Sequence, residues 1–163
     1  MAKKVTTVAL LSALAVALAY LERLLPSFVP LPHFKLGLSN IVLLFSVYTL
    51  PRRQSFVILF AKIALFALLF GSFSALAYAS IGGLFALFIM LALSRSKKLS
   101  PVGVSVAGAA GHNVGQLCAA CLLLGSPHPL TLLPVLLLGG IATGLITGLI
   151  STLLIAQSHH FLR

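Results

Sequence analysis

The sequence predicts an all-α, polytopic integral membrane protein, a bundle of six transmembrane helices in a single domain over residues 1–163. Apolar residues make up 60% of the chain and charged residues only 7%, and the mean hydropathy of +1.17 lies far outside the range of a soluble domain. Proline, charge and polar clusters divide the apolar residues into runs close to the ~20 residues that cross a hydrocarbon core. Helices are expected because lipid offers no partner to unpaired backbone groups and no alternating barrel pattern is visible.

The apolar runs fall at about residues 5–25, 36–50, 54–73, 74–94, 101–124 and 130–157. The first run imitates a secretory signal, because Lys3 and Lys4 precede it and Ala17-Leu-Ala19 resembles a cleavage site. It continues through Leu25, beyond the length of an ordinary signal, so we expect it to be retained as the first span.

A proline-rich stretch, PSFVPLPHF, separates the first two runs. Its three prolines exclude a regular helix and predict a stiff, extended connection that lies over the bundle like a lid. The second span is then only about 15 residues long. We expect its N-terminus, around Lys35 to Asn40, to begin inside the bundle, where the helix dipole and the lysine would attract an anionic group.

The net charge of +10 is distributed unevenly between the two sides of the predicted bundle. On one side the only lysine or arginine residues are Arg23 and Lys35, both in the first loop, and His128 lies in the last loop of that side. Because cytoplasmic loops carry the excess of lysine and arginine, both termini are predicted to be cytoplasmic in a multi-pass protein of the cell membrane. The basic residues thus mark topology, and we expect no nucleic-acid partner. The other side carries Lys3, Lys4, Arg52, Arg53, Arg95, Lys97, Lys98 and Arg163.

Small residues at four-residue spacing predict where helices approach closely. They occur in the first, fifth and sixth runs. Threonine and serine lie beside the glycines of the last run, which favours a packed, hydrogen-bonding face there over a ligand site. The small residues are Ala9, Ala13 and Ala17, then Gly111 and Gly115, then Gly140, Gly144 and Gly148, and the hydroxyl residues are Thr143, Thr147 and Ser151.

Three polar residues, His112, Asn113 and Gln116, lie near the middle of the fifth run, within about a 100° arc of a helix. Polar side chains at this depth face a partner or water, so they either hydrogen-bond between helices or contact a ligand, and both readings stay open. Lys62 lies about 12 Å into the third run, where it either snorkels outward or faces a cavity. The C-x-x-C pair of the fifth run points elsewhere and is interpreted as packing, not redox chemistry.

Glu22 is the only acidic residue of the chain. On a helix it lies about 180° from Ala13, so the alanine face can dock another helix while the Glu22 face turns toward Lys62, Lys35, His112 or a ligand. An exposed Glu22–Arg23 pair in water is the other possibility.

These residues predict one outward-opening binding site. Its cationic surplus favours a small-molecule ligand with a carboxylate or phosphate on an apolar or aromatic body. No cluster fits a metal ion, and the adjacent His159 and His160 lack further ligands, so we expect neither metal nor cofactor. The predicted substrate-binding residues are Glu22, Lys35, Asn40, Lys62, His112, Asn113 and Gln116.

Four stretches, YLERLLP, PHFKLGLSN, GVSVAGAAGHNVGQL and LLLGGIATGLITG, resemble the membrane family called heptaprenyl diphosphate synthase component I, or Gx transporter. That family in turn resembles the six-helix S components of energy-coupling factor (ECF) transporters. The resemblance implies that Ala9, Ala13 and Ala17 dock against a transmembrane energy-coupling subunit, and that the loop from Pro26 to Lys35 gates the pocket. It does not transfer the substrate.

The functional expectation is a substrate-binding subunit for uptake of a small molecule, a vitamin or a precursor, powered by ATPases in other chains. The chain has no G-x-x-x-x-G-K-[ST] motif for nucleotide. Intrinsic prenyl-chain synthesis is not expected, because it uses aspartate-rich motifs to hold magnesium and this chain has no aspartate. The alternative is a non-catalytic membrane subunit associated with isoprenoid or quinone-related synthesis.

Overall fold

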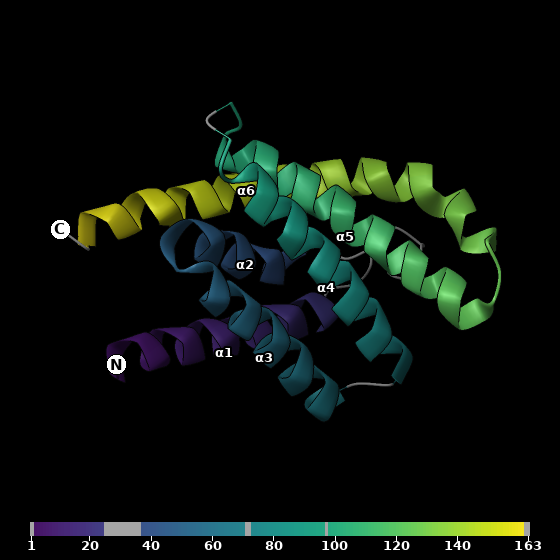
Figure 1. Cartoon of the computed structure of the whole chain (residues 1–163), viewed down its shortest axis with the longest axis horizontal. Coiled ribbons are helices and arrows are strands. Elements are labelled where there is room, and N and C mark those ends of the chain that lie inside the picture. The colour runs from purple at the N-terminus through teal and green to yellow at the C-terminus, as the bar shows by residue number, and fades with distance from the viewer. Residues whose placement is uncertain (1, 25–36, 71–72, 97, 162–163) are drawn as a thin grey trace.

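The computed structural model describes residues 2–24, 37–70, 73–96 and 98–161, and these residues are helical apart from short connections (Figure 1). The six predicted spans correspond to six α helices, and a 3₁₀ turn, η1, precedes the last one. The predicted lid from Pro26 to Lys35, including the predicted site residue Lys35, lies outside the described residues. The elements are α1 (Ala2–Leu24), α2 (Leu38–Thr49), α3 (Arg52–Phe70), α4 (Phe73–Leu93), α5 (Pro101–Leu124), η1 (His128–Leu132) and α6 (Leu133–Phe161).

Local sequence signals set the ends of α5. The Ser100 hydroxyl accepts a hydrogen bond from the Gly103 N–H at 3.2 Å, and Pro101 occupies the first turn, where its missing N–H leaves no bond unmade. At the other end Gly125 adopts φ 60°, a left-handed conformation that favours glycine. The predicted bounds of 101–124 are therefore confirmed.

The helices are those of a membrane protein. Among the residues that the structure describes, four segments are long and apolar enough to cross a bilayer: Lys4–Glu22, Phe73–Leu93, Pro101–Leu124 and His128–Ser158. Helix α2 has only 12 residues, so it rises about 18 Å against a hydrocarbon core of about 30 Å. The start of α1 and the end of α6 lie at the same end of the bundle (Figure 1), as an even number of crossings requires.

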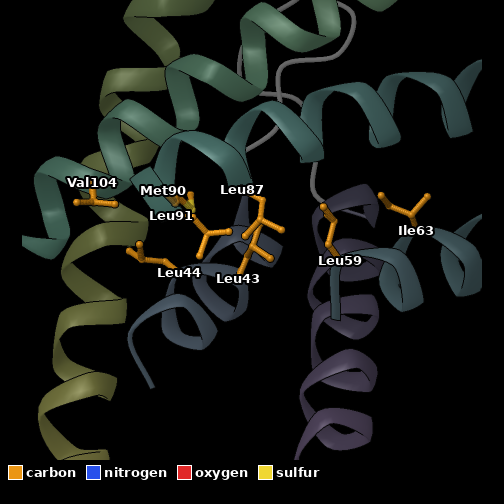
Figure 2. Packing of buried hydrophobic residues seen from close by; sticks show 8 residues of the cluster. All are labelled: Leu43, Leu44, Leu59, Ile63, Leu87, Met90, Leu91 and Val104. Carbon is orange, nitrogen blue, oxygen red and sulfur yellow. The ribbon is translucent and has the colours of Figure 1, made fainter. Parts of the chain in front are cut away.

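The short helix α2 lies at the centre of the bundle and contacts every other α helix, whereas α1 packs only against α2 and α3 among the described elements. Leucines of α2 form the core with side chains of α3, α4 and α5. Figure 2 shows Leu87 of α4 directed at Leu43 of α2 within this cluster. The cluster consists of Leu43, Leu44, Leu59, Ile63, Leu87, Met90, Leu91 and Val104.

Glycines allow α5 and α6 to pack backbone against backbone. A Cβ added to Gly144 would lie 2.6 Å from Cα of Val106, and one added to Gly148 would lie 2.9 Å from Cα of Val102. Both distances are below any ordinary van der Waals contact, so only glycine fits without moving a helix. The predicted small-residue contacts of α6 are confirmed.

Helix α4 is the partner of the α5 glycines. A Cβ on Gly115 would lie 2.9 Å from Cα of Gly82, which gives α4 and α5 the same close approach. The predicted hydrogen-bonding face of α6 is also present: Ser105 and Thr147 share a hydrogen bond of 3.0 Å, and Ser151 donates to the Ile41 carbonyl at 3.3 Å. Each of these bonds joins two helices, and the hydroxyl side chains that make them are buried.

Candidate ligand-binding site

A cavity of about 240 Å³ lies between the helices, and all six α helices contribute residues to its wall. Phe66, Ala75, Ala79 and Ala109 supply apolar surface to it. Six of the seven predicted binding residues line it, although they come from four different helices. These six are Glu22, Asn40, Lys62, His112, Asn113 and Gln116.

The side chain of Glu22 extends from α1 to the N-terminus of α2. Its carboxylate accepts a hydrogen bond from the N–H of Gly37, which is the N-cap of α2 and has φ 71°. The side chain of Glu22 is buried, with 9% exposed, so the exposed ion-pair interpretation is wrong. A helix N-terminus stabilises a negative charge through its unpaired N–H groups and its dipole. The only acidic side chain of the chain therefore accepts a backbone hydrogen bond at the start of α2.

Lys62 faces the same helix N-terminus from α3. Its Nζ donates to the Ser39 hydroxyl at 3.0 Å, and Ser39 is itself buried. Lys62 lies ten residues after the start of α3 at Arg52, so about 15 Å along the helix, and its ammonium lines the cavity. The snorkelling interpretation is therefore wrong, and a positive charge lies at cavity depth.

Asn113 acts between helices as well as lining the cavity. Its Nδ2 donates to the Leu136 carbonyl at 2.5 Å, which ties α5 to the first turn of α6. Gly140 makes room for this contact, because a Cβ there would lie 2.7 Å from Nδ2 of Asn113. Interhelical hydrogen bonding, one of the two interpretations left open by the sequence, therefore applies to Asn113.

Gln116 is positioned differently, although it lies one turn further along the same face. Its Cγ would be 2.9 Å from a Cβ on Gly82, so its aliphatic stem packs on α4. Within the part of the chain that the structure describes, its amide group has no hydrogen-bond partner while it lines the cavity. Gln116 thus presents an amide group to which a ligand in the cavity can bond.

The sequence did not single out several polar groups of the cavity wall. Tyr78 and Ser74 of α4 and Ser39 of α2 line it, as does Thr143 of α6. Thr143 was expected only to pack, and it is indeed buried, with its hydroxyl donating to the Gly140 carbonyl at 3.3 Å. Hydroxyl side chains are ordinary in membrane helices, so the presence of these residues did not indicate a site in the sequence.

The donor set of the cavity suits an organic ligand better than a metal ion. Glu22 is its single carboxylate, and among the described residues no three His, Cys, Asp or Glu side chains gather in a group that could hold a metal. Cys118 and Cys121 are free thiols that are not part of the cavity wall. Hydrogen-bond donors and one ammonium group remain, and these recognise oxygen-rich ligand groups.

The predicted docking residues lie on the opposite side of α1. Ala9, Ala13 and Ala17 are exposed in the structure, while Ala15 and Glu22 of the same helix are buried. The alanine face is therefore available to a partner helix or to lipid.

Comparison with models of known protein families identifies a match over most of the chain. The model of the family heptaprenyl diphosphate synthase component I matches residues 11–154. The chain belongs to this family. The match includes the six described cavity residues named above, from Glu22 to Gln116, and reaches from α1 into α6. No curated protein and no solved structure matches the chain.

Proposed function

We propose that the chain is a membrane subunit that binds a small molecule in the polar cavity and passes it to partner subunits for uptake, driven by ATPases in other chains. The observation that carries the proposal is the convergence of Glu22, Asn40, Lys62, His112 and Gln116 on one cavity inside an apolar bundle. Polar and ionisable groups at membrane depth are costly and usually functional, and no single helix explains their meeting.

The ligand of this proposal carries a carboxylate or phosphate. Lys62 offers a positive charge beside the α2 N-terminus, where the Glu22 carboxyl group accepts from the Gly37 N–H. A helix N-terminus favours an anion. A ligand anion would displace or neighbour the Glu22 carboxylate and gain the ammonium group of Lys62 as its partner.

The alanine face supplies the docking surface of the proposal. Three small side chains at four-residue spacing let a partner helix approach the α1 backbone. Their exposure on the side away from the cavity leaves binding and docking on separate faces of one helix.

The family name supports a second candidate function. A component of heptaprenyl diphosphate synthase would be a non-catalytic membrane subunit that accompanies a soluble prenyl synthase. The chain has no aspartate and one glutamate, so it cannot build the carboxylate site that holds magnesium and diphosphate for prenyl transfer. Binding without chemistry is the role left to it in either candidate.

Co-purification from native membranes in mild detergent separates the two candidates. Recovery with a transmembrane coupling subunit and two ATPases supports uptake, whereas recovery with a soluble prenyl synthase supports the second candidate.

The variant Ala13→Trp should abolish recovery of the coupling subunit, because a bulky side chain prevents close helix approach. Leu14→Trp is the matched control, since Leu14 is also exposed, at 48%, but points about 100° away. Equal recovery with both variants would remove the docking claim.

A further inference from the structure

A second cavity of about 370 Å³ shares lining residues with the polar one, is half open to the surroundings and is mainly apolar. It lies between the C-terminal half of α5, the turn η1 and the start of α6. Ser126, in the connection between α5 and η1, and His128, the first residue of η1, contribute polar groups to its wall. Its apolar wall consists of Leu117, Ala120, Leu124, Pro129, Leu132 and Leu136.

Two side chains belong to both cavities. Tyr78 of α4 and Gln116 of α5 line the polar cavity and the apolar cavity alike. Each has an apolar body and a polar tip, the arrangement found where one end of a ligand is polar and the other apolar. A molecule that passes between them would have its two ends in environments of opposite character.

We infer that the ligand is an amphiphile whose anionic head lies beside Lys62 and whose hydrocarbon tail passes Gln116 and Tyr78 into the apolar cavity. The inference rests on the proposed function for the head and adds the tail. The polar cavity alone, at about 240 Å³, is smaller than the roughly 300–1,000 Å³ of typical ligand sites, and the apolar cavity supplies the missing space. A small, purely polar anion would leave the apolar cavity without an occupant.

The strength of tail binding follows from the apolar area that it buries. Each methylene group transferred from water into an apolar wall contributes ~0.8 kcal/mol, which is about fourfold in affinity. The affinity should therefore rise with tail length until the apolar cavity is filled, and the head group alone should bind weakly.

Normal alkyl phosphates test the inference with the full chain in detergent micelles. Inorganic phosphate, ethyl, butyl, hexyl and octyl phosphate are titrated by calorimetry. Wild type should gain roughly fourfold per methylene. Ala120→Trp and, from η1, Leu132→Trp fill the apolar cavity and should remove this gain while ethyl phosphate binds as in wild type. Leu122→Trp is the matched control on α5, because Leu122 is 75% exposed and outside both cavities. Partitioning of the probes into micelles is common to all variants.

The outcomes separate the tail from the head. A length dependence that is the same in Ala120→Trp, Leu132→Trp and Leu122→Trp would overturn the inference, because the apolar cavity would then hold lipid or detergent and not the tail. Binding that depends on Lys62 but not on tail length would overturn it too, and would leave the proposed function intact. Absence of binding by every probe, or equal binding by Lys62→Met, would overturn the anionic head and with it both proposals.

Discussion

The hydrogen bond from Asn113 to the Leu136 carbonyl predicts that two neighbouring polar residues of α5 respond oppositely to the same substitution. Asn113→Ala removes a 2.5 Å bond between α5 and α6. Interhelical hydrogen bonds in membranes contribute on average about 0.6 kcal/mol and at most about 1.7 kcal/mol. We therefore expect Asn113→Ala to lower the free energy of unfolding by about 1 kcal/mol. Gln116→Ala removes no hydrogen bond to a described residue. The free energy of unfolding of this variant should therefore stay within about 0.5 kcal/mol of that of wild type.

Reversible unfolding in mixed micelles with increasing dodecyl sulfate measures both free energies. Ligand affinity of the folded fraction, measured with butyl phosphate, should show the reverse order, with the larger loss in Gln116→Ala. If Asn113→Ala costs no stability, the bond to Leu136 does not hold α5 and α6 together as we infer. If Gln116→Ala costs as much stability as Asn113→Ala, Gln116 has a structural role and the contrast between the two residues is refuted.

Two further substitutions test the packing of α6 and the role of the single acid. Gly144→Ala should cost roughly 1–3 kcal/mol of unfolding free energy, because its Cβ would lie 2.6 Å from Cα of Val106. Gly103→Ala is the control: its Cβ would meet its nearest neighbour at 3.5 Å, and alanine has the higher helix propensity, so it should cost no stability. Equal costs in unfolding titrations would contradict this. Glu22→Gln keeps an acceptor for the Gly37 N–H but removes the negative charge, so phosphate affinity should rise by calorimetry; unchanged or weaker phosphate binding would show that the carboxylate does not compete with the ligand anion.

The sequence predicted the helices well because apolarity and helix signals agree in most of the chain. Residues 101–124 were predicted to the residue, since a serine, a proline and a glycine mark the ends of α5. The end of α6 was missed: the helix continues from 157 to Phe161, because backbone hydrogen bonds persist where side chains become polar. The turn η1 was also missed, since its hydrogen-bond pattern has no hydrophobic period.

The candidate site was predictable where a residue is out of place in an apolar helix. Lys62, Glu22 and the His112 group stood out for that reason, and the structure brings them to one cavity. The pairing of Glu22 with the Gly37 N–H was not predictable, because it depends on how α1 and α2 cross. The apolar cavity gave no signal at all, since Leu117 and its neighbours look like ordinary core residues.

The small molecules released from the purified chain test the central claim, that the polar cavity binds an anionic ligand at Lys62. Wild type, Lys62→Met and the matched control Leu68→Met, an exposed position of the same helix, are purified from the same membranes and their bound molecules are compared by mass spectrometry. We expect a carboxylate or phosphate compound in wild type and Leu68→Met that is absent from folded Lys62→Met. The same compounds in all three proteins, or lipid alone in wild type, would contradict it.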